Sequence, residues 1–184
     1  MRLQRLLSAA AALLALAVPA TGRAQAPTGG VLPDSVEERL VAVLLDLRDS
    51  TSAVRGQVAV FRRDLSQAGA ETVVGRATSL HTRCANATGA LQRAEVQVRP
   101  GPGWPSGARA ASAELITAMQ ALRNVLRTEC DVGLAPEGPG ARADSLRAWG
   151  PYRTGMLQRG ISDLDHAVGR FARATSIYLE PRIP

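Results

Sequence analysis

The chain has 184 residues, of which 46% are hydrophobic, 21% are charged and only 3% are aromatic, and its formal net charge is +6. These proportions are typical of an ordinary soluble domain and exclude a disordered or collagen-like chain. All 22 basic residues are arginine. Because Schiff-base chemistry, a P-loop and an amine general base each need a lysine side chain, the composition excludes all three.

The first 26 residues have the pattern of a secretory signal peptide. Arg2 and Arg5 precede an apolar run over residues 6–20, and small residues follow as far as Ala26. A basic start, an apolar run of about 7–15 residues and an A-x-A site are the three parts of such a leader. We expect export to the periplasm or the cell exterior, with cleavage after Ala26 or, because proline follows that residue, after Ala24.

Removal of this leader leaves residues 27–184, which we interpret as a single domain. The leader takes three arginines and no acid with it, so the net charge falls from +6 to +3. So small a positive charge argues against nucleic-acid binding. The leader's apolar run is shorter than the roughly 20 residues that a membrane span needs, and no later stretch is long enough. We therefore expect no transmembrane segment after cleavage.

The first predicted helix covers residues 34–67. Its apolar residues recur at steps of three and four from Val36 to Leu65, with an interruption at Ser50 and Thr51. Ser35 and Glu38 fit an S-x-x-E capping box at its start. Gly69 predicts a left-handed stop at its end.

Three more helices follow, over about residues 71–98, 108–130 and 144–179. The same three-and-four spacing runs through each of them, and segments rich in proline and glycine separate the second from the third and the third from the fourth. Gly150 and Pro151 predict a kink in the fourth helix. Since nothing alternates with the period of a strand, we predict an all-α protein, an antiparallel up-down-up-down four-helix bundle.

The two tryptophans fall at opposite ends of this predicted bundle. Trp104 lies in the loop after the second helix, whereas Trp149 and Tyr152 flank the Gly150-Pro151 pair. A loop tryptophan typically packs as a lid over the end of a bundle and less often contacts a partner. We predict that Trp104 is such a lid.

Cys84 and Cys130 are predicted to form a disulfide. Both occupy core positions, on the second and third helices, and an exported pair of cysteines is usually oxidised. A symmetric hairpin would leave them about 15 Å apart along the axis at 1.5 Å per residue, beyond the limit of about 7 Å between bridged Cα atoms. The third helix would have to start lower to remove this offset. Two buried free thiols are the alternative.

No metal, cofactor or catalytic site is predicted. His81 and Cys84 share a helix face and could begin a metal site, but only His166 with Asp163 or Asp165 could complete it. An oxidised Cys84 could not be a ligand, so we interpret these residues as structural or solvated. We find no arrangement of residues that indicates nucleophilic or acid–base catalysis.

These observations predict an exported, non-enzymatic binding or scaffolding module of the cell envelope. Its partner would be an envelope protein or a small ligand. One alternative is a small-ligand or metal carrier that uses the bundle interior, with His81, His166 and Cys84 as its polar candidates. Another is a holdase-like periplasmic chaperone, although the repeated L-T-x-x-Q motif of such chaperones is missing.

Overall fold

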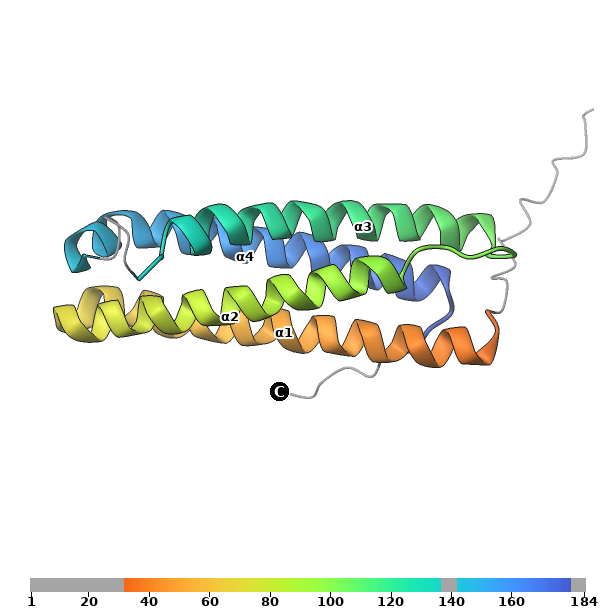
Figure 1. The fold of residues 1–184 in the computed structure, drawn as a ribbon, viewed down its shortest axis with the longest axis horizontal. Coiled ribbons are helices and arrows are strands. Elements are labelled where there is room, and N and C mark those ends of the chain that lie inside the picture. The colour runs from red at the N-terminus through yellow and green to blue at the C-terminus, as the bar shows by residue number, and fades with distance from the viewer. Residues whose placement is uncertain (1–31, 137–141, 180–184) are drawn as a thin grey trace, which may run out of the picture.

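The four predicted helices form a four-helix bundle. The structure, a computed structural model, describes residues 32–136 and 142–179, so the predicted leader lies outside the described residues. The elements are α1 (Asp34–Gln67), α2 (Ala70–Gln97), α3 (Ser106–Leu126), the π-helical η1 (Arg127–Val132) and α4 (Ala143–Ala174). Figure 1 shows the long helices side by side along one axis. The prediction of an all-α four-helix fold is confirmed, and the described ranges contain no strand.

Polar contacts between neighbouring helices show their relative directions. In each pair of helices, residue numbers rise along one helix as they fall along the other, and the chain passes back and forth along the long axis in Figure 1. The pairs are Asp46–Arg93 and Asp64–Arg76 between α1 and α2, Arg55–Asp165 and Arg62–Gln158 between α1 and α4, and Glu114–Arg170 and Glu129–Arg153 between α4 and α3 with its continuation η1.

The junction between α1 and α2 differs from the predicted one. Gly69 has a φ of −65° and occupies the N-cap position of α2, so the predicted left-handed stop is wrong. The connection is only two residues, both extended, and leaves no room for a left-handed cap. Instead, Arg147 of α4 donates to the carbonyl oxygens of Leu65 (3.3 Å) and Ala68 (2.9 Å). A side chain from another helix thus satisfies carbonyls that a helix end leaves unpaired.

The start of α1 also differs from the prediction. Pro33 is the N-cap residue, and no side chain caps the helix. The backbone carbonyl of Pro33 accepts hydrogen bonds from the N–H groups of Val36 (2.8 Å) and Glu37 (3.0 Å). Because Ser35 already lies inside the helix, the predicted capping box with Glu38 is wrong.

The last helix ends five residues earlier than predicted. Ser176 adopts a left-handed conformation with a φ of 59°. The N–H of Ile177 donates to the carbonyl oxygen of Ala172 at 2.9 Å, and the N–H of Ser176 donates to that of Arg173 at 3.3 Å. This pair of bonds is a Schellman motif, in which the left-handed residue is usually glycine.

The helix α4 continues through Pro151 without interruption. At the preceding residue, a Cβ added to Gly150 would lie 2.6 Å from Leu65 Cδ1. The absent side chain therefore lets α4 approach α1 closely. A bend at this point stays a prediction.

The core is mainly aliphatic, and the hydroxyls of its buried threonines and serine are hydrogen-bonded to backbone carbonyls. Thr51 breaks the apolar spacing in the sequence, yet it is buried and its hydroxyl donates to the Leu47 carbonyl oxygen at 3.0 Å. At the end of the bundle, Trp104 is 6% exposed and packs against Phe171 with ring centroids 6.2 Å apart. This burial is what the interpretation of Trp104 as a lid predicts.

Candidate functional site

The sulfur atoms of Cys84 and Cys130 lie 2.02 Å apart, at disulfide distance, with 6.3 Å between the Cα atoms. A shift of α3 removes most of the expected offset. The hydroxyl of Ser112 donates to the carbonyl oxygen of Val98 at 2.6 Å. The six α3 residues before Ser112 therefore extend past the end of α2, by about 9 Å. Figure 1 shows this overhang at the end of the bundle where α3 begins.

An ion pair and a histidine–aspartate contact lie beside the disulfide end of α3. Cys130 lies in the π-helical turn η1, and its neighbour Glu129 accepts from Arg153 of α4 at 3.2 Å. The guanidinium of Arg153 rests on Gly133, where an added Cβ would lie 1.9 Å from its Nη1 atom. Asp131 Oδ1 lies 4.0 Å from His81 Nε2. Isolated π turns often occur at functional sites, but here the turn joins α3 to α2 and α4.

The residues considered as metal ligands do not come together. His81 lies beside Asp131, and Glu129, two residues before Asp131, pairs with Arg153 of α4. His81 is therefore at about the same height along the bundle as Arg153. His166 is thirteen residues further along α4, which corresponds to about 20 Å. Asp165 is paired with Arg55. Across residues 32–136 and 142–179, no three His, Cys, Asp or Glu side chains are grouped so that they could hold a metal ion.

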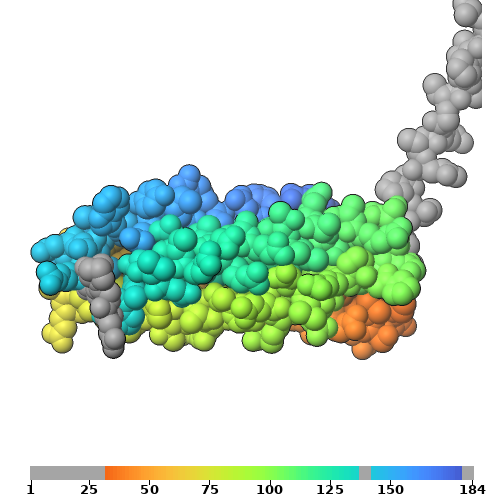
Figure 2. Space-filling model, turned by 45° about the horizontal axis from the view of Figure 1, so that its top comes forward, coloured from red at the N-terminus to blue at the C-terminus, as the bar shows by residue number. Residues whose placement is uncertain are grey.

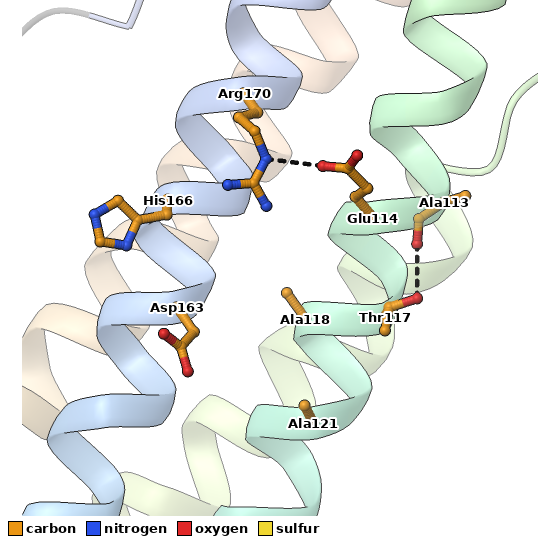
Figure 3. A pocket seen from close by; sticks show the side chains of 8 residues that line it. All are labelled: Ala113, Glu114, Thr117, Ala118, Ala121, Asp163, His166 and Arg170. Carbon is orange, nitrogen blue, oxygen red and sulfur yellow. Dashed lines mark hydrogen bonds and ion pairs between the residues drawn. The ribbon is translucent and has the colours of Figure 1, made fainter.

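Asp163 and His166 line an open groove between α3 and α4. Its volume is about 630 Å³, and it follows the line where these two helices meet in Figure 2. Figure 3 shows Arg170 reaching Glu114 of α3 (2.8 Å), with Asp163 on the side of α4 nearer to α3 and the ring of His166 directed away from α3. Alanine side chains line the α3 wall: Ala113, Ala118 and Ala121. Because Asp163 and His166 are both exposed, the groove offers contact area and no shielded acid–base pair.

Two guanidinium groups lower the pKa of the buried Asp64 carboxyl. The guanidinium of Arg76 donates to its carboxylate at 2.8 Å, and that of Arg63 donates at 3.1 Å. The hydrogen bond from Arg76, followed by that from Arg63, lowers the pKa of the Asp64 carboxyl from its ordinary value of 3.8. The contact with Arg76 links α1 to α2 beside their junction, so the carboxylate stabilises the fold.

Exposed aromatic side chains mark a different surface. Phe61, Phe171 and Trp104 are buried, whereas Trp149 is 61% and Tyr152 57% exposed. These two are three residues apart on α4, so they share a helix face, and the partly exposed Met156 continues that face four residues later. We call Trp149, Tyr152 and Met156 the aromatic face. The sequence predicts the two rings at this end of the bundle, but the face they share with Met156 becomes clear only from their exposure in the structure.

No protein-family model, curated protein or solved structure matches the chain. Within the described residues, no helix has the length and apolar character needed to cross a membrane. The candidate site is therefore assigned from this chain's own residues, and the aromatic face is the candidate.

Proposed function

We propose that this protein is an exported, non-enzymatic binding or scaffolding module of the cell envelope. The observation that carries the proposal is the aromatic face, where a tryptophan and a tyrosine of one helix are each more than half exposed. Large apolar side chains gain free energy when they are removed from water. Tryptophan and tyrosine are also among the residues that contribute most to binding at protein interfaces.

The packed interior supports surface binding over carriage of a ligand inside the bundle. Leucine, valine and alanine side chains fill most of the described core. Of the polar candidates for a carrier, Cys84 is at disulfide distance from Cys130, and the two histidines lie about 20 Å apart along the axis. A carrier would have to form its site from residues that the fold separates.

The envelope location is supported by the predicted leader and by the paired cysteines. Disulfides persist mainly in oxidising compartments such as the periplasm. Both features are expected of an exported protein, and the absence of a catalytic arrangement in the sequence agrees with a role in binding.

Expression of the full chain in a bacterium with a periplasm tests the location. We expect the protein in the envelope fraction, with a mass shortened by cleavage after Ala24 or Ala26. Protein that stays full-length in the cytosol would contradict an envelope role.

Affinity capture from an envelope extract tests the binding role. The wild-type bait should retain a partner or further copies of itself, and a bait that carries both Trp149→Ala and Tyr152→Ala should not. A bait with Tyr178→Ala is the matched control, because Tyr178 is 76% exposed but lies outside the aromatic face. Equal retention by all three baits would argue against the aromatic face as the binding surface.

A further inference from the structure

The aromatic face lies in the middle of a longer stripe on α4. Residues at alternating steps of three and four share one side of a helix. Counting from Tyr152 in both directions at these steps gives a stripe of exposed or partly exposed side chains within α4: Ser145, Trp149, Tyr152, Met156, Arg159 and Asp163. Arg142, the exposed residue with extended backbone that immediately precedes the helix, continues the stripe at its N-terminal end. The stripe is about 30 Å long, apolar at its centre and charged at both ends.

The order of side chains in this stripe is self-complementary about Tyr152. Trp149 lies three residues before Tyr152 and Met156 four residues after it. Arg142 lies ten residues before, and Asp163 eleven residues after. A two-fold axis beside Tyr152 would therefore place each tryptophan against a methionine of the other copy, and each Arg142 against an Asp163.

Each of these pairings is chemically favourable. A thioether beside an aromatic ring gains attraction beyond simple burial. Arginine and aspartate form an ion pair, and neither the guanidinium of Arg142 nor the carboxylate of Asp163 is hydrogen-bonded or ion-paired to another described residue. Asp163 also lines the groove between α3 and α4, where the short alanine side chains leave room for an arginine from another molecule.

We propose that the aromatic face binds a second copy of this chain, so that the two α4 helices pack antiparallel around a two-fold axis at Tyr152. This inference rests on the proposed binding role of the same face and names its partner. Closed two-fold dimers are the commonest soluble assemblies, and they require a patch that complements itself.

Sedimentation equilibrium of the protein purified from the envelope fraction tests the proposal. The wild type should form dimers, and Trp149→Ala should raise the dissociation constant by about a hundredfold or more, since both copies of an interface tryptophan are lost at once. Tyr178→Ala should leave the constant unchanged. A monomer at all accessible concentrations would overturn the proposal.

A charge exchange tests the two-fold register. Arg142→Asp alone and Asp163→Arg alone should each weaken dimerisation by about tenfold, since each places like charges together at two positions. The double variant should restore the wild-type constant. Arg109→Asp, on the exposed surface of α3, is the matched control and should have no effect. Additive weakening in the double variant would contradict the pairing.

Cross-linking tests the position of the axis. In the proposed dimer the side chains at position 152 of the two copies face each other, so Tyr152→Cys should oxidise to a disulfide-linked dimer. Tyr178→Cys should not. A monomer that captures a different protein through the aromatic face would overturn this inference and leave the proposed function standing. A monomer that sediments with phosphatidylglycerol vesicles would also overturn it. A dimer that stays in the cytosol would instead overturn the envelope role.

Discussion

The two tryptophans of this chain lie at opposite ends of the bundle, in opposite environments. Trp104, in the loop between α2 and α3, is 6% exposed and packs on Phe171, whereas Trp149, near the start of α4, is 61% exposed. Residue type alone therefore does not distinguish a structural aromatic from a binding one. The difference lies in the helix face: the loop folds Trp104 over the core, while the buried stripe of α4 contains Leu146 and Gly150 and turns Trp149 outward.

The largest effect on stability should come from the cysteine pair, which lies toward the end of the bundle that carries Trp149. Replacement of both cysteines by alanine should lower the free energy of unfolding by about 4 kcal/mol, because a chain-entropy treatment of the 46-residue separation gives that value. Denaturant titration of the wild type and the double variant measures it. Helix content by circular dichroism should not change. Equal unfolding midpoints would contradict a stabilising bridge.

At the opposite end of the bundle, Trp104→Ala should lower the free energy of unfolding by about 3 kcal/mol. This is a small value for truncation of a buried aromatic side chain, because the ring lies at the edge of the core. Trp149→Ala should change the stability of the monomer by less than about 0.5 kcal/mol. Thermal unfolding at a concentration too low for association compares the two. Similar losses from both substitutions would remove the distinction between the two ends.

Stability should fall on acidification, partly through Asp64. The pKa of Asp64 is lower in the folded protein than its ordinary value of 3.8, which we take for the unfolded chain. Its contribution to the free energy of unfolding is therefore fully present above that value and is lost as the pH falls through the folded pKa. Asp64→Asn should be less stable at neutral pH and should lose less stability between pH 5 and pH 2. Denaturant titrations across that range measure the slope, and parallel curves for the two proteins would contradict this role.

The smallest effect is a gain at the end of α4. Ser176→Gly should stabilise the protein by about 0.5–1 kcal/mol, because glycine adopts the left-handed conformation without the steric cost of a Cβ. Ser176→Ala is the control and should give no such gain. If both variants unfold at the same temperature, the left-handed turn is not the source of the effect.

The helices could be predicted from the sequence because their apolar spacing is long and regular. Their ends could not be predicted as well, because tertiary contacts decide them: Arg147 satisfies the end of α1, and Ser176 takes a position where glycine is usual. In the sequence, Thr51 interrupts the apolar spacing because it is polar. In the structure it is buried, because its hydroxyl donates a hydrogen bond to the Leu47 carbonyl oxygen.

The candidate site was harder to predict than the fold. The sequence identified Cys84 and Cys130 from composition and compartment, but the register that brings them together depends on the overhang of α3, which no local pattern shows. The aromatic face was missed because apolar spacing was interpreted only as core. The helix α4 has two apolar stripes, a buried one that includes Leu146 and Leu157 and the exposed aromatic face. The spacing of either stripe alone does not show which of the two packs into the core.

Fluorescence of two single-tryptophan variants tests the central claim most directly. The variant with Trp149→Phe retains only Trp104, and we predict short-wavelength emission at every concentration. The variant with Trp104→Phe retains only Trp149, and we predict long-wavelength emission in dilute solution that shifts to shorter wavelength as the protein associates. Emission from Trp149 that stays at long wavelength at high concentration and in envelope extract would contradict a binding role for the aromatic face.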